Sequence, residues 1–109
     1  MNEFEKMFDV YQEIIRKEIE KDGEMEGKLP KIQSLIFVLH GVCNNRFSKD
    51  YKAKSAGFIS KIEGQSLGNI KYTPDQKFIY WGILMDWFAL MIEERYAIVS
   101  NLNRVDFGR

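Results

Sequence analysis

Cysteine, histidine and proline are scarce in this chain, which holds one, one and two of them among its 109 residues. A lone cysteine cannot form an intrachain disulfide, and one cysteine with one histidine cannot supply the four ligands of a structural zinc site. With so little proline and no low-complexity tract, the composition is not typical of a disordered chain. We therefore expect a single folded domain over residues 1–109, with no metal and no cofactor.

The sequence also lacks a net charge, because 16 basic side chains balance 16 acidic ones. Its overall charge therefore favours neither nucleic acid nor a membrane surface. Glu3 and Glu5 stand where a secretory signal would have a basic start followed by an apolar run. The mostly apolar segment 78–92 is shorter than the about 20 residues that a membrane span needs. We expect a cytoplasmic protein that makes no contact with a membrane.

Apolar residues recur at spacings of three and four in the first part of the chain, which predicts an amphipathic helix that ends near Gly23. The apolar face of this helix holds Phe4, Met7, Phe8, Tyr11, Ile14, Ile15 and Ile19. Residues 22–29 are polar and are expected to form a loop. Pro30 suits a first helical turn, so a second helix is predicted from there to about Cys43, with apolar residues on more than one side.

Two further helices are predicted in the second half of the chain. Ser48 is a suitable N-cap for a third helix that ends near Gly64. The segment 73–76, Thr-Pro-Asp-Gln, combines an N-cap, a first-turn proline and a capping box, and predicts a fourth helix that runs to about Asn101. Since residues 78–92 are apolar around most of the circumference, the expected fold is all-α: an antiparallel four-helix bundle with a long, mostly buried C-terminal helix.

Along the fourth helix the side chains form two apolar stripes separated by one polar strip. The first stripe holds Phe78, Trp81, Met85, Phe88, Ile92 and Val99. The second stripe holds Tyr80, Leu84, Trp87, Met91 and Ile98. The polar strip holds small or polar residues, namely Gly82, Asp86, Ala89, Glu93, Ala97 and Ser100. The core of the bundle accounts for one stripe, and the other is either core as well or an interface with another protein or a second copy.

Charge is unevenly distributed along the chain. Residues 1–26 hold nine acidic and four basic side chains, a net charge of −5, whereas residues 27–76 hold three acidic and eight basic ones, a net charge of +5. A basic cluster, Lys49, Lys52 and Lys54, is a candidate rim for an acidic protein surface or for nucleic acid. Lysine rather than arginine dominates there, which does not favour bidentate reading of bases.

Residues able to carry out catalysis are few. Cys43 lies one helical turn from His40, but the surrounding run is apolar, whereas a nucleophilic thiol needs an accessible, electropositive setting. Asp86 is expected on the exposed polar strip. The alternative places it in the core against His40, where an unpaired carboxylate would be costly.

From these patterns we expect a non-enzymatic cytoplasmic protein that acts by binding another protein or itself, such as an adaptor, an inhibitor or an immunity-type factor. Its interface candidates are an aromatic anchor, Tyr80, Trp87 and Met91, and the basic cluster Lys49, Lys52 and Lys54 as an electrostatic rim. One alternative is a nucleic-acid-binding protein that uses the basic middle of the chain. Another is a small-ligand-binding helical domain with a site near Asp86, His40 and Tyr80.

Overall fold

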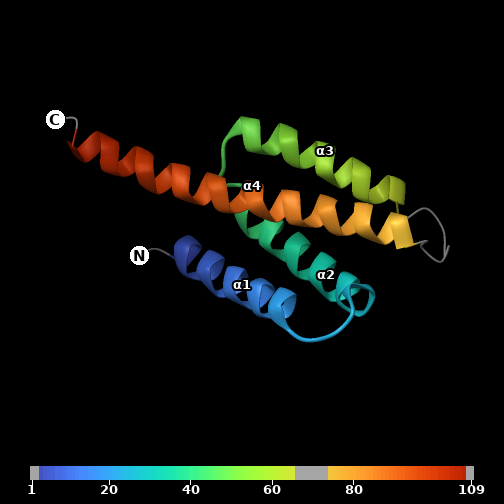
Figure 1. The fold of residues 1–109 in the computed structure, drawn as a ribbon. Coiled ribbons are helices and arrows are strands. Elements are labelled where there is room, and N and C mark those ends of the chain that lie inside the picture. The colour runs from blue at the N-terminus through green and yellow to red at the C-terminus, as the bar shows by residue number, and fades with distance from the viewer. Residues whose placement is uncertain (1–2, 66–73, 108–109) are drawn as a thin grey trace.

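Four α-helices and no strand make up the computed structural model over the residues that it describes, 3–65 and 74–107 (Figure 1). They are α1 (Glu3–Glu20), α2 (Met25–Cys43), α3 (Lys49–Gln65) and α4 (Pro74–Phe107). Consecutive helices run in opposite directions (Figure 1), which confirms the expected all-α, antiparallel four-helix bundle with a long C-terminal helix. None of the four helices, as far as they are described, has the length and hydropathy of a membrane span.

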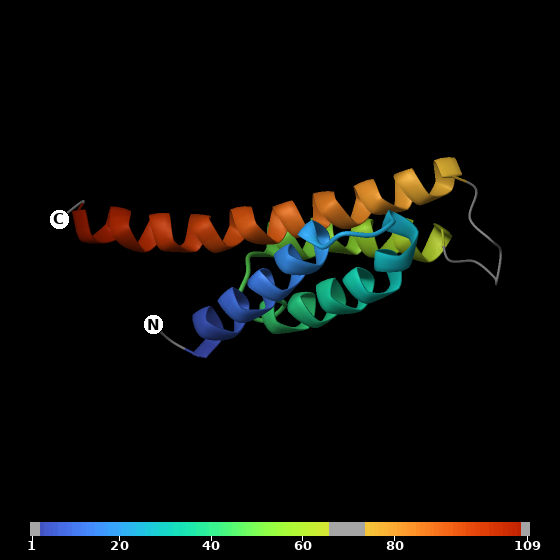
Figure 2. The ribbon, with the colours of Figure 1, turned by 60° about the horizontal axis from the view of Figure 1, so that its bottom comes forward.

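The helices pack in the order α1, α2, α4, α3, so α2 and α4 form the central pair. These two helices run in the same direction, and each is covered on its outer side by an antiparallel neighbour (Figures 1 and 2). The last turns of α4 extend beyond the ends of the other three helices (Figure 2). The molecule is accordingly elongated, with extents of 56, 29 and 20 Å.

Four residues of the second stripe of α4 form the centre of the core, as their heptad-like spacing allows. Tyr80, Leu84, Trp87 and Met91 are all buried. They face a buried row on α2, spaced by four, three and four residues: Ile32, Ile36, Leu39 and Cys43. The first stripe is covered only in part, because Phe88 is buried whereas Phe78 keeps 65% of its surface exposed. Over residues 78–92 the long helix is therefore covered by its neighbours along one stripe and partly exposed along the other.

An aromatic cluster attaches the start of α1 to Phe47, which lies in the connection between α2 and α3. The rings of Phe4 and Phe8 both lie against Phe47, with centroids 5.7 and 6.2 Å apart, respectively. The predicted apolar face of α1 is wider than its contact with the bundle, since Met7 and Ile14 remain 44% and 40% exposed. A cylinder that rests on one neighbour buries only a narrow stripe, so the outer edges of a broad apolar face stay in contact with water.

Helix α2 begins at Met25, five residues before the predicted start at Pro30. The prediction was wrong because Met25 and Leu29 stand four residues apart on one face, and Leu29 is buried in the core while Met25 packs against it. Their burial draws an additional turn into the helix and offsets the backbone hydrogen bond that Pro30 cannot donate. The Lys28 ammonium group of this turn donates hydrogen bonds to the carbonyls of Ile19 and Lys21, at the end of α1.

The start of α3 is as predicted, because the Ser48 Oγ accepts a hydrogen bond of 3.1 Å from the backbone N–H of Tyr51, the third residue of the helix. Pro74 is the first residue of α4, and the predicted N-cap Thr73 lies outside the described residues. Helix α4 continues to Phe107 rather than ending near Asn101. No glycine or proline occurs between Asn101 and Phe107, so the sequence contains no residue that would stop the helix there.

A candidate interaction groove between α3 and α4

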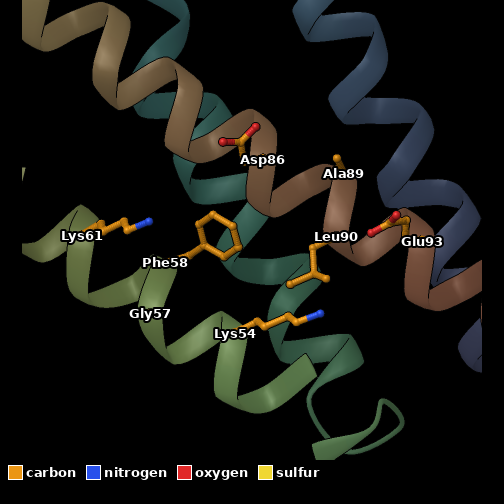
Figure 3. A pocket seen from close by; sticks show the side chains of 8 residues that line it. All are labelled: Lys54, Gly57, Phe58, Lys61, Asp86, Ala89, Leu90 and Glu93. Atoms are coloured by element: carbon orange, nitrogen blue, oxygen red, sulfur yellow. The ribbon is translucent and has the colours of Figure 1, made fainter. Parts of the chain in front are cut away.

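A groove of about 540 Å³ runs along the outer surface between α3 and α4 (Figure 3). Each helix contributes four residues at the same spacing of three, one and three, which is one face of a helix. From α3 they are Lys54, Gly57, Phe58 and Lys61, and from α4 they are Asp86, Ala89, Leu90 and Glu93. We call this surface the α3–α4 groove. Its α4 wall is the polar strip of the sequence.

The floor of the groove is apolar and its middle is open. Phe58 and Leu90 lie between the two helices (Figure 3) and are half-buried and buried, respectively. Gly57 and Ala89 stand beside them and carry almost no side chain. A Cβ added to Gly57 would meet no heavy atom within 4 Å. The hollow therefore exists because two small residues stand where larger side chains would fill the space.

Charged side chains border the groove on both sides. The lysine rim consists of Lys54 and Lys61 on α3, and the acidic rim of Asp86 and Glu93 on α4 (Figure 3). Since the helices are antiparallel, Lys61 is at the level of Asp86 and Lys54 at the level of Glu93. The Lys61 ammonium group lies 5.5 Å from the centroid of the Phe58 ring. Among the described residues no ion pair within 4.0 Å joins the two rims, so all four charges face solvent.

The floor is held from below by Trp87, the largest fully buried side chain. Its ring is stacked on Phe58 at 6.5 Å and 14° and meets Phe37 edge-on at 5.0 Å and 88°. Its indole N–H donates a hydrogen bond of 3.1 Å to the Oγ of Ser55, on α3. Trp87 thereby joins α2, α3 and α4, and it fixes the position of the Phe58 ring in the groove.

The predicted interface residues divide between core and surface. Tyr80, Trp87 and Met91 are buried inside the single chain, and the Tyr80 hydroxyl donates a hydrogen bond to the Oε1 of Gln33. In this fold a partner would reach them only after a rearrangement, so their role as anchors stays a prediction. The basic cluster, Lys49, Lys52 and Lys54, is exposed on α3, and of these three Lys54 lines the groove.

The sequence did not single out four groove residues as interface candidates, namely Gly57, Phe58, Lys61 and Leu90. A signal for them was present. The charged positions Lys54 and Lys61 on α3 are seven residues apart, as are Asp86 and Glu93 on α4, and each pair brackets one small and one apolar residue. Two faces of matching pattern on antiparallel neighbours can form the two walls of one groove.

Asp86 is exposed on the polar strip, as predicted. The proposed ligand site near Asp86, His40 and Tyr80 is not assembled in this fold. The Nδ1 of His40 shares a hydrogen bond of 2.9 Å with the hydroxyl of Tyr51, and its ring lies 5.1 Å from that of Trp87. Asp86 faces the groove outside, whereas His40 lies at the junction of α2 with α3 and α4.

Cys43 and His40, the single cysteine and histidine of the sequence, pack against neighbouring side chains and are not arranged for nucleophilic catalysis. Cys43 is free and buried, and burial raises the pKa of its thiol to about 12. A thiol in that setting is protonated at neutral pH. Burial also lowers the pKa of His40 from its ordinary value of 6.5. Neutral imidazole is therefore the form that fits the core.

This arrangement predicts that acidification destabilises the protein through His40. Its pKa is lower in the folded chain than in the unfolded chain, so below pH 6.5 the unfolded state binds more protons. The contribution of neutral His40 to the free energy of unfolding is fully present above pH 6.5. It decreases as the pH falls toward the folded-state pKa of His40. Urea unfolding at about pH 7.5 and about pH 5.5 should show this loss. His40→Gln should reduce the difference, and an unchanged difference would contradict the assignment.

Among the described residues, no group of three or more histidine, cysteine or acidic side chains is arranged to hold a metal ion. Comparison of the chain with protein-family models, with curated protein sequences and with solved structures found no match. What the α3–α4 groove can do therefore follows from its shape and charge.

Proposed function

We propose that this chain is a non-enzymatic protein that acts by binding a helix of another polypeptide in the α3–α4 groove. One observation carries the proposal: an apolar floor lies between a lysine rim and an acidic rim whose charges make no ion pair with each other. Apolar contact in the middle and charge at the edge are the usual anatomy of a protein interface. Two parallel walls formed by helices suit a third helix, as in helix-in-groove recognition.

The groove specifies the chemistry of its partner. A helix lying along it must present small or aliphatic side chains to Phe58 and Leu90. Its edge beside the lysine rim should be acidic, and its edge beside the acidic rim should be basic, because like charges at those positions would repel. Charge thus fixes both the rotation and the direction of the bound helix.

The core supports the non-enzymatic part of the proposal. Cys43 and His40 are engaged in packing and hydrogen bonding, and neither lines the groove. We also propose a cytoplasmic location, which suits a chain whose single thiol is free and buried. An adaptor, an inhibitor or an immunity-type factor would each act through such a surface.

A synthetic helical peptide tests this proposal. The peptide carries a leucine and alanine stripe, with glutamates along one edge and lysines along the other. We expect it to bind the protein in a fluorescence anisotropy titration. Gly57→Leu, whose Cβ would meet no heavy atom within 4 Å, places a larger side chain in the groove and should weaken binding by about tenfold or more.

Gly41→Leu is the matched control. Gly41 is exposed on α2, and a Cβ there also meets nothing within 4 Å. Both substitutions remove a helical glycine and should stabilise the fold, by up to about 1 kcal/mol. Loss of peptide binding in Gly57→Leu but not in Gly41→Leu would support the groove as the site. Equal binding by both variants and the natural chain would count against it.

The nucleic-acid alternative is disfavoured by the same surface. Lys49 and Lys52 are exposed, but the acidic rim with Asp86 and Glu93 borders the other side of the groove. A phosphate backbone would be repelled there. A DNA duplex titration at two salt concentrations separates the two functions, because binding through phosphates weakens steeply with salt. Absence of duplex binding at low salt would remove this alternative.

A further inference from the structure

We propose that the partner of the α3–α4 groove is a second copy of this chain, and that the two copies meet groove to groove as a symmetric dimer. This inference rests on the proposed function, since it names the occupant of the same site. In the dimer, α3 of each copy lies over α4 of the other, so four helices form the interface. The arrangement follows from the order of charges along the groove.

A twofold axis running along the groove, between the copies, places α3 of one copy over α4 of the other at the same level. Lys54 then faces Glu93 of the second copy, and Lys61 faces Asp86 of the second copy. The symmetry repeats both contacts, so each of the four charged residues of a copy faces an opposite charge on the other copy. The two levels are seven residues, about 10 Å, apart. The charge pattern of the groove is therefore complementary to the same groove on a second copy, as an isologous interface requires.

The other face-to-face arrangement is rejected by charge. A twofold axis across the helices, rather than along them, would place α3 over α3 and α4 over α4. Lys54 would then meet Lys61 of the second copy, and Asp86 would meet Glu93 of the second copy. Like charges at every corner oppose that arrangement. The rims thus select one relative orientation of the two copies.

The floor of the groove suits close approach between copies. Gly57 and Ala89 leave room for the opposite helix, and Phe58 and Leu90 would lose their contact with water. Helix α3 is about 25 Å long, and two adjacent helices are about 20 Å wide. A face of this size, about 500 Å², is smaller than the about 800 Å² per partner of a standard interface, so we expect a weak dimer that forms as the concentration rises. The net charge of zero adds no long-range repulsion between copies.

Charge reversal tests the dimer without disturbing the core, because all four charged side chains are exposed. The acidic variant combines Lys54→Glu with Lys61→Glu. The basic variant combines Asp86→Lys with Glu93→Lys. Light scattering over a concentration series should show a natural chain that reaches the dimer mass, whereas each variant alone stays a monomer. Circular dichroism verifies that both variants remain helical.

Mixing the two variants gives the decisive result. The acidic variant presents glutamates to the new lysines of the basic variant, and its natural acidic rim meets natural lysines. An equimolar mixture should therefore return to the dimer mass, whereas either variant at the same total concentration should not. Restoration in the mixture supports groove-to-groove pairing in the stated orientation.

Two results would overturn the dimer. One is a natural chain of monomer mass at every concentration, and the other is a dimer that both charge-reversed variants retain. Neither result removes the proposed function by itself. If the synthetic peptide still binds a strictly monomeric chain and Gly57→Leu weakens it, the groove remains a helix-binding site with a different partner. If the peptide fails to bind that monomer, both proposals fall.

Discussion

Trp87→Ala is expected to lower the free energy of unfolding by about 3–5 kcal/mol, the range for truncating a buried large aromatic residue. Trp87 is fully buried and packs on Phe58 and Phe37, so the substitution opens a cavity where α2, α3 and α4 meet. It also leaves the Ser55 hydroxyl without its hydrogen-bond donor. Since domains of this size are stable by about 5–15 kcal/mol, the variant should be close to unfolding at physiological temperature.

Urea unfolding monitored by circular dichroism measures this effect. Trp81→Ala is the matched control, because the second tryptophan stands on the same helix but is only half-buried. Trp81→Ala should lower the free energy of unfolding by clearly less than Trp87→Ala does. Similar losses for both variants would mean that the two stripes of α4 are covered equally, which contradicts the observed packing.

Phe8→Ala is expected to cost about 3–5 kcal/mol as well, and its effect should be concentrated on α1. Phe8 is fully buried between Phe4 and Phe47, and the guanidinium carbon of Arg95 lies 6.0 Å from the centroid of its ring. These contacts attach α1 to the connection between α2 and α3 and to α4. Without them α1 is attached more weakly, mainly through Ile15 and its other contacts with α2, whereas the contacts among α2, α3 and α4 remain.

Hydrogen exchange resolves this regional effect. In Phe8→Ala the backbone amides of α1 should exchange much faster, with a smaller change in α4. Met7→Ala is the control, because Met7 is the neighbouring residue but remains 44% exposed. It should leave α1 nearly as protected as in the natural chain. A uniform rise of exchange across all four helices in Phe8→Ala would contradict a separately attached α1.

The sequence was informative wherever a local rule acts alone. Ser48 caps α3 because its hydroxyl reaches a free backbone N–H, and this depends on a few adjacent residues. Tyr80, Leu84, Trp87 and Met91 of the second stripe of α4 are buried because a helix apolar on several sides must be covered by its neighbours. On the polar strip, Asp86, Ala89, Glu93 and Ala97 are exposed, and a carboxylate such as Asp86 is more stable in water than buried without a partner.

Features that depend on packing between helices were less predictable. The start of α2 was placed at Pro30, and the burial of Leu29 moved it to Met25. Met7 and Ile14 belong to the apolar face of α1 by spacing, but one neighbouring helix covers only part of that face. The groove itself requires the register of α3 against α4, and periodicity within one helix does not determine that register.

The most direct test of this account is the rate at which a thiol reagent labels Ala89→Cys, compared with the natural Cys43 in the same molecule. Ala89 is exposed on the wall of the groove, whereas Cys43 is buried and burial raises its pKa to about 12. At low protein concentration, where the chain is monomeric, Ala89→Cys should be labelled rapidly and Cys43 only as fast as the bundle opens. Equal rates, or a protected Ala89→Cys beside a reactive Cys43, would contradict the placement of the groove and of the core.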